Sequence, residues 1–195
     1  MVMRSKADRI VALVDRMRTN SQDQAMYLNL PLASEAMKLL EELDDPEEGP
    51  LGKAYACNAI VEQLPEYDAP RFVLGILRRE LTWLEESTEK SDWLHPEDLK
   101  AEIQKLEDYI DPKALSMDEF CRKYGRHLLF DPVERSPKWE EIYYEVEEKC
   151  YRHLKGVPRG MGFCFGYWAE KRGVLAKYGI DWQTPHMMNP RVMFD

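Results

Sequence analysis

The chain has 195 residues, of which 44% are hydrophobic and 32% charged, and its formal net charge is −9. This composition is typical of a soluble globular protein and excludes a disordered one. The negative charge argues against a general affinity for nucleic acid or anionic lipid. Five Trp, ten Tyr and six Phe side chains are enough for one well-packed core, so we expect a single domain over residues 1–195.

The charge is unevenly distributed along the chain. From Lys149 to Asp195 there are eight Lys or Arg against three Asp or Glu, a local charge of +5, which leaves −14 for the remainder. Such an imbalance is most often a solvated face. It also suits a protein that presents two different surfaces to its partners.

The N-terminus lacks the uncharged apolar run of a signal peptide, and no apolar stretch approaches the roughly 20 residues that span a bilayer. The chain has four widely spaced cysteines and no Cys-x-x-Cys pair: Cys57, Cys121, Cys150 and Cys164. We therefore expect a cytoplasmic protein with reduced thiols and no membrane partner.

Helical periodicity dominates the first part of the chain. Ser5 and Asp8 have the spacing of an N-terminal capping box, ahead of a helix whose apolar residues recur about one turn apart as far as Met17. A second helix begins near Pro31, whose missing N–H needs no partner in a first turn. It ends in the acidic, proline-marked loop 44–50, a candidate internal boundary.

Three further helices are expected before residue 111. The first spans residues 51–64, and the second starts near Pro70 with a broad apolar face, which places it at the centre of this half. The polar linker 85–95 is a second candidate boundary. The helix that follows it carries a narrow apolar stripe up to Ile110, as expected for a surface helix or a hairpin partner.

The pattern continues to be helical towards the C-terminus. Ser116 and Glu119 form a better capping box, for a short helix, and residues 128–130 after it are expected as a turn of helix or an extended plug. Pro137 marks the first turn of a longer helix that ends near Gly156. A last helix covers roughly residues 162–178.

The final segment, residues 183–195, is extended by its prolines and is too apolar to be a solvated tail. We expect it to dock on the core of its own domain. The alternative is a groove in a second subunit or in another protein, for which its methionines are suited.

Together these elements predict an all-α protein of seven to eight helices. Short connections favour antiparallel neighbours, so we expect an irregular bundle or a stack of antiparallel helical hairpins, with the extended C-terminal tail docked on the core. No period of 30–50 residues emerges, which disfavours a regular solenoid.

The stretch from residue 136 to 182 is the most aromatic part of the chain and its one markedly basic part. A glycine-rich elbow joins its two helices. Free N–H groups at a helix N-terminus attract anions, and glycines let the backbone approach a ligand closely. The candidate anion-binding or partner-binding residues are therefore Arg152, Lys155, Arg159, Gly160, Gly162 and Arg172. The alternative is a tight turn whose glycines serve packing alone.

A zinc site is a weaker hypothesis. Cys and neutral His suit zinc, and the spacing of Cys150 and His153 places both on one helix face, with Cys164 as a further candidate. Structural zinc sites usually have two closely spaced ligand pairs, whereas this stretch has one. Both cysteines also lie on apolar stripes, so we expect no metal and no other cofactor.

The sequence contains no Glu-x-x-His, His-Glu-x-x-His or Gly-x-Ser-x-Gly motif, so an enzyme is the less favoured class, although a Cys–His pair that meets only in space stays open. We expect a non-enzymatic protein-interaction or regulatory module of the cytosol, with a protein partner, either itself or another. The alternative is nucleic-acid or phosphate-ligand binding through the basic, aromatic quarter 149–182, which the net charge disfavours.

Overall fold

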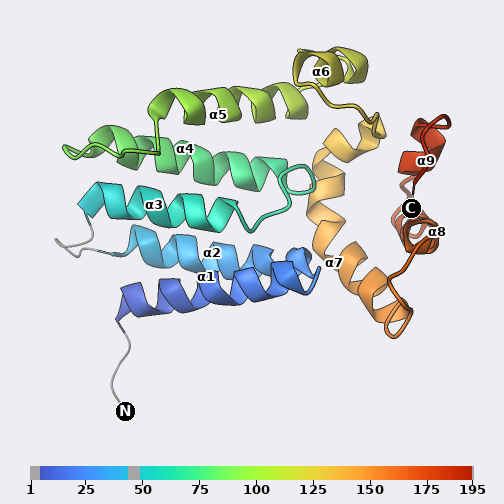
Figure 1. The fold of residues 1–195 in the computed structure, drawn as a ribbon, viewed down its shortest axis with the longest axis horizontal. Coiled ribbons are helices and arrows are strands. Elements are labelled where there is room, and N and C mark those ends of the chain that lie inside the picture. Colours follow the sequence, from blue (N-terminus) through green and yellow to red (C-terminus); the bar gives the residue numbers. More distant parts are fainter. Residues whose placement is uncertain (1–4, 44–48, 195) are drawn as a thin grey trace. The chain divides into compact units, whose positions relative to one another are not determined.

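The computed structural model describes residues 5–43 and 49–194, and these residues are helical without strands, as predicted (Figure 1). They form nine α-helices, the last of only four residues, and two short 3-10 helices. The chain divides into two compact units, Met1–Glu107 and Asp108–Asp195. The division lies inside α5 (Pro96–Ile110), so it falls at neither of the two predicted boundaries, loop 44–50 and linker 85–95. Residues 44–48 of that loop lie outside the described residues. A single domain stays a prediction.

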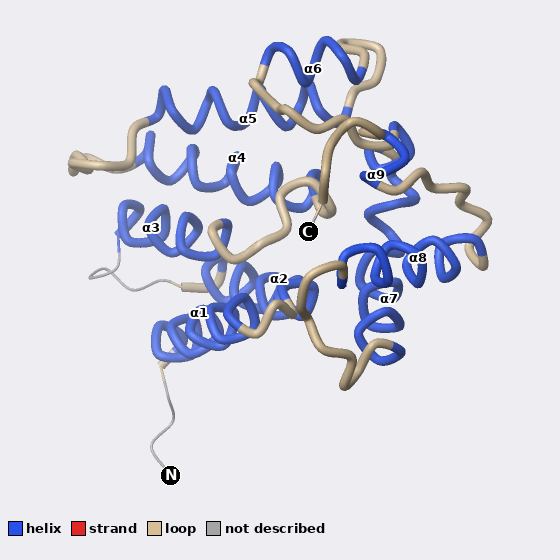
Figure 2. The backbone as a smooth tube through the Cα atoms, turned by 45° about the vertical axis from the view of Figure 1, so that its right-hand side comes forward, coloured by secondary structure: helices blue, strands red, loops and turns tan. Residues whose placement is uncertain are grey.

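The first unit is a row of antiparallel helices that lie side by side in chain order (Figures 1 and 2). Its elements are α1 (Lys6–Gln22), η1 (Met26–Leu28), α2 (Asn29–Glu41), α3 (Gly49–Val61), α4 (Pro70–Glu86) and α5 (Pro96–Ile110), the last three residues of which belong to the second unit. α1 packs mainly on α2, and α3 mainly on α4. The unit is therefore a stack of helical hairpins, as the short connections predict.

Local signals begin these helices where the sequence places them. The Ser5 hydroxyl accepts the Asp8 N–H at 3.0 Å, and the Asp8 carboxylate accepts the Ser5 N–H at 3.1 Å, which completes the predicted capping box. α2 begins at Asn29, two residues before Pro31. The fully buried Asn29 side chain donates to the backbone carbonyls of Met17 and Gln63, so it joins α1, α2 and the end of α3.

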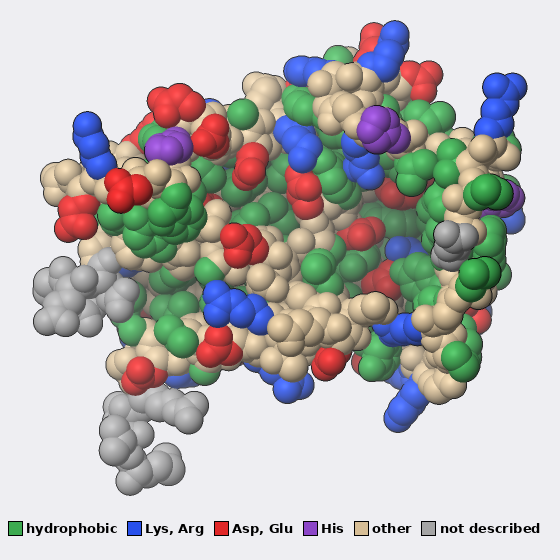
Figure 3. Space-filling model, viewed as in Figure 1, with side chains coloured by type: hydrophobic (Ala, Val, Ile, Leu, Met, Phe, Trp, Pro, Cys, Tyr) green, Lys and Arg blue, Asp and Glu red, His purple; other side chains and the backbone are tan. Residues whose placement is uncertain are grey.

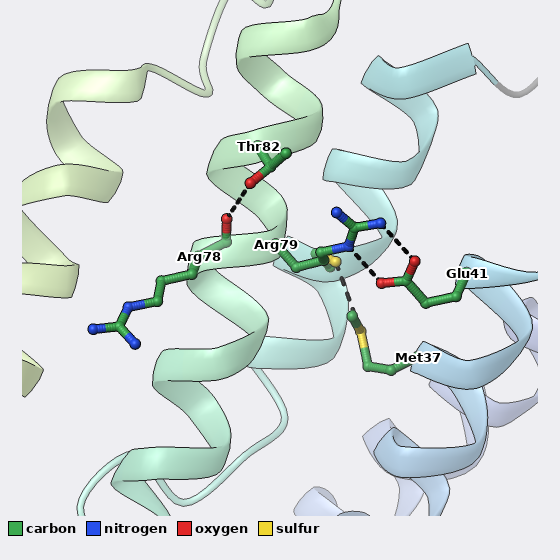
Figure 4. Close-up of polar contacts among 6 residues, drawn as sticks. Met37, Glu41, Arg78, Arg79 and Thr82 are labelled. Atoms are coloured by element: carbon green, nitrogen blue, oxygen red, sulfur yellow. Dashed lines mark hydrogen bonds and ion pairs between the residues drawn. The ribbon is translucent and has the colours of Figure 1, made fainter.

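α4 has a broad apolar face, as predicted, and this face is buried along its whole length: Val73, Leu74, Ile76, Leu77, Glu80, Trp83 and Leu84. Glu80 is the one charged residue in that set. Beside it, Arg79 binds both carboxylate oxygens of Glu41 at 2.5 and 2.6 Å, which joins α4 to α2 (Figure 4). Cys57 is fully buried, with its Sγ 3.7 Å from the Met37 Sδ, so it is a core residue as expected.

The second unit contains α6 (Met117–Lys123), η2 (Pro132–Arg135), α7 (Pro137–His153), α8 (Phe163–Ala176) and α9 (Pro185–Met188). α7 and α8 pack on each other around one core cluster: Trp139, Ile142, Val146, Cys150, Val174, Leu175, Ile180 and Trp182. α7 ends three residues before Gly156, and α8 ends at Ala176 and not at Tyr178. Both helices are slightly shorter than predicted because each closes in a turn.

Arg135 is a buried cation in η2 that no sequence pattern marks out. Its guanidinium donates hydrogen bonds of 2.5 to 2.9 Å to four backbone carbonyls at and beyond the end of α5: Asp108, Tyr109, Asp111 and Leu115. The last carbonyls of a helix have no partner within the helix. Arg135 therefore caps α5 and the turn that follows it.

The C-terminal segment docks within the second unit, as predicted. The Asn189 amide exchanges two hydrogen bonds with the backbone of Leu129, at 2.8 and 2.9 Å, and the Gln183 N–H donates to the Asp131 carboxylate at 2.6 Å. The segment is not fully extended, because Pro185 starts the one-turn helix α9.

Candidate functional site

The elbow between α7 and α8 is a tight turn built on glycine. Gly156 and Gly162 have positive φ angles of 83° and 80°, a conformation that favours glycine over other residues. The Phe163 N–H donates to the Gly160 carbonyl at 3.0 Å, and the Phe165 N–H donates to the Gly162 carbonyl at 3.2 Å. Two N–H groups at the start of α8 are thus used by the turn itself. Anion binding at this elbow stays a prediction.

The basic candidates have different surroundings, and their role as one binding site stays a prediction. Arg152 pairs with Glu148 at 3.2 Å, and the Arg159 guanidinium lies 5.7 Å from the Tyr151 ring centroid, while Lys155 is exposed. Arg172 is nine residues after Phe163, the first residue of α8, which is about 13.5 Å along the helix axis. Arg172 therefore lies towards the C-terminal end of α8, whereas the other three basic candidates precede this helix.

The three zinc candidates have different surroundings. Cys150 is fully buried in the core cluster, and burial raises the pKa of its thiol to about 12, which disfavours the thiolate that a metal needs. The His153 Nδ1 lies 2.7 Å from a carboxylate oxygen of Glu170, and Cys164 is half-buried. Within the described residues, no three His, Cys, Asp or Glu side chains are arranged to hold a metal ion.

Lys171 is a buried cation that the sequence analysis did not find. Its ammonium pairs with Glu147 at 2.7 Å, and the two side chains are only 8% and 12% exposed. The Tyr167 hydroxyl donates towards both oxygens of the same carboxylate, at 2.7 and 2.8 Å. Position 171 lies three and four residues before Val174 and Leu175, so the helical period of α8 would have placed it on the buried face.

Aromatic rings surround this ammonium. Its Nζ lies 4.8 to 5.7 Å from the centroids of four rings: Trp139, Tyr143, Tyr167 and Trp182. Such distances are typical of cation–π contacts. The recess beside Lys171 is too small for a water molecule, so the cage holds its own cation and has no room for a ligand. Its role is to fix the packing of α7 on α8.

The outer face of α8 forms an apolar groove, which is the main candidate site. Its lining residues recur at helical spacing along α8 and are completed by the segment around α9: Phe165, Trp168, Ala169, Arg172, Gly173, Ala176, Thr184 and His186. We call this set the α8 groove. Its volume is about 480 Å³, within the range of protein ligand sites.

The aromatic side chains of the α8 groove hold one another in place. Phe165 packs edge-to-face against Trp168 and against His186, both with ring centroids 5.5 Å apart. Phe194 packs edge-to-face on Trp168 at 5.1 Å. These contacts use edges and faces of the rings in a favoured geometry, so the walls are ordered without an occupant.

Arg172 is the one Lys, Arg, Asp or Glu residue among the lining residues of the α8 groove. One guanidinium nitrogen lies 3.6 Å from a carboxylate oxygen of Asp181, and another lies 3.8 Å from the Met187 Sδ. Asp181 is 92% exposed, so water weakens that ion pair. The groove thus combines an apolar surface with one positive group that is only weakly neutralised.

Large apolar side chains continue beyond the groove on the C-terminal segment. Phe165, Met187, Val192 and Met193 are all at least 38% exposed. Figure 3 shows hydrophobic side chains exposed over the region of α8 and α9. An exposed apolar area of this kind is typical of an interaction surface.

The fold and the groove define an all-α protein with an apolar, weakly basic surface groove. Comparison of the chain with known protein families, curated proteins and solved structures found no match. None of the described helices combines the length and apolar character needed to cross a bilayer. The function is therefore inferred from the geometry of the chain itself.

Proposed function

We propose that the protein is a non-enzymatic interaction module of the cytosol that docks a partner protein in the α8 groove. The observation that carries this proposal is the groove itself, which has a volume of about 480 Å³ and apolar walls formed by Phe165 and Trp168. The chain's own C-terminal segment borders this groove but leaves it open. Docking of an apolar segment there removes this surface from water, a gross gain of roughly 25 cal/mol per Å² that is partly offset by the entropy lost on association.

The chemistry of the lining residues supports binding over catalysis. Within residues 5–43 and 49–194, no carboxylate and no thiol lines the groove. The Thr184 hydroxyl accepts the Met187 N–H at 3.3 Å and so caps α9, and the His186 ring packs edge-to-face on Phe165. These two side chains are engaged in building the wall. The neighbouring methionines, Met187 and Met193, are flexible and suit an adaptable interface.

A pair of glycine variants tests this proposal. Gly173 and Gly166 both lie inside α8, and a Cβ added at either would meet nothing within 4 Å, but only Gly173 lines the groove. Leucine at either position therefore replaces a poor helix former, and only Gly173→Leu fills the groove.

We expect a partner captured from cell extract by the wild type and by Gly166→Leu to be lost with Gly173→Leu. The captured protein is then purified and its affinity measured for all three proteins by calorimetry. Equal affinity for the three proteins would refute docking in the α8 groove.

A further inference from the structure

The floor of the α8 groove is hollow at Gly173. Glycine in a helix interior is destabilising by about 1 kcal/mol relative to alanine. Nothing within the chain lies close enough to require it, because a Cβ at Gly173 would meet no atom within 4 Å. With Ala169 and Ala176 one turn to either side, the floor is lined by small residues. A large apolar group therefore has room to lie over Gly173.

The size of the groove limits what can lie there. A whole helix with its side chains is about 10–12 Å across, so single side chains of a partner are what can enter a groove of 480 Å³. One bulky side chain with its flanking backbone fits this space. Phe165 and Trp168 present ring edges and faces, which suit an aromatic side chain best.

The positive charge of Arg172 favours an occupant that carries a negative charge. Arg172 lies beside Gly173 in sequence and shares the groove with it, and among the residues that the structure describes no acidic side chain lines the same space. Its contact with Asp181, at 3.6 Å, is longer than the roughly 2.7–2.9 Å of a charge-assisted hydrogen bond. A carboxylate that arrives with the occupant can bind the guanidinium with two parallel hydrogen bonds in a less exposed place.

We infer that the α8 groove binds a partner segment in which an acidic residue stands next to a large aromatic residue, with the ring over Gly173 and the carboxylate on Arg172. This inference rests on the proposed function, since it names the chemistry of the partner for the same groove.

The test uses two probes that differ in one group: the capped peptides acetyl-Ala-Glu-Trp-Ala-amide and acetyl-Ala-Gln-Trp-Ala-amide. Binding to the full chain is followed by the amide NMR signals of the α8 groove, whose assignment identifies Gly173 directly. We expect the glutamate peptide to bind about tenfold more tightly, which corresponds to about 1.4 kcal/mol, since a hydrogen bond between two charged groups is stronger than one to a neutral amide. Arg172→Gln should remove that preference and leave the affinity for the glutamine peptide unchanged.

The glycine variants separate this inference from the proposed function. Gly173→Leu should abolish binding of both peptides, and Gly166→Leu should bind them as the wild type does; circular dichroism checks that both variants are folded. Equal affinities for the two peptides, unaffected by Arg172→Gln, would overturn the acidic partner and leave the groove as a docking site. Binding of neither peptide, or binding that survives Gly173→Leu, would count against the groove itself.

Discussion

Glu80 is the side chain whose perturbation has the clearest thermodynamic consequence. It is fully buried on the core face of α4, and neither carboxylate oxygen has a hydrogen bond of good geometry. Burial raises the pKa of Glu80 to about 8, and the carboxylates of Glu102 on α5 and Glu62 after α3 act in the same direction, against the Asn58 amide. Glu80 is therefore protonated in the folded protein at neutral pH.

The sign of the pH dependence follows from this shift. The ordinary pKa of the group is 4.5, so between pH 4.5 and about 8 the folded chain keeps a proton that the unfolded chain has lost. The contribution of Glu80 to the free energy of unfolding is complete below pH 4.5, the pKa of the group in the unfolded chain. It is lost as the pH rises towards about 8, the pKa of the group in the folded protein. The loss is about 1.4 kcal/mol per pH unit inside that window.

Glu80→Gln removes the titration and keeps the shape of the protonated acid. Between pH 5 and pH 7 the wild type should lose about 2.5 kcal/mol of unfolding free energy relative to the variant. The assay is urea unfolding at several pH values, followed by tryptophan fluorescence, with the exposed Glu86→Gln on the same helix as the control. If Glu80→Gln and the wild type changed in parallel over this range, Glu80 would not be a protonated buried acid.

Three further changes test the packing of the second unit, each by chemical or thermal denaturation. Lys171→Met should lower the free energy of unfolding by about 3–5 kcal/mol, because it leaves the Glu147 carboxylate buried without its cation. Adding Glu147→Leu should restore most of that loss. If the effects of the two substitutions simply added, the pairing would be contradicted. Arg135→Met should cost about 3 kcal/mol through the loss of the carbonyl cap, so a variant of unchanged stability would show that water replaces it. Deleting residues 183–195 should lower the melting temperature by several degrees, and an unchanged value would mean that this segment does not stabilise the unit.

Much of the fold could be predicted because helix ends are local. The capping boxes at Ser5 and Ser116 and the early proline at position 137 depend on residues within one turn, and each begins a helix in the structure. Hydrophobic periodicity likewise identified the buried face of α4. Such signals need no knowledge of distant parts of the chain.

The candidate site was predicted less well because it depends on contacts between distant residues. The grouping of Arg172 with the elbow cations stays a prediction, and Arg172 lies nine residues, about 13.5 Å, along α8 from its first residue. The α8 groove also needs Thr184 and His186, which fold back beside α8 only because Gln183 and Asn189 bind residues some 50 to 60 positions earlier. Charge composition alone likewise does not show which cations are buried. Lys171 is a charged residue in the basic part of the chain, yet the structure buries it.

The ion pair inside the second unit also constrains how this sequence can diverge. Replacing Lys171 or Glu147 alone leaves the other charge buried without a partner in an apolar interior. Replacing both with apolar residues of similar volume is tolerated. Descendants of this chain should therefore carry both residues or neither. Since the partners stand on different helices, a viable lineage also keeps the axial alignment of α7 and α8. The pair thus offers a signature, 24 positions apart, by which distant relatives of the second unit can be recognised.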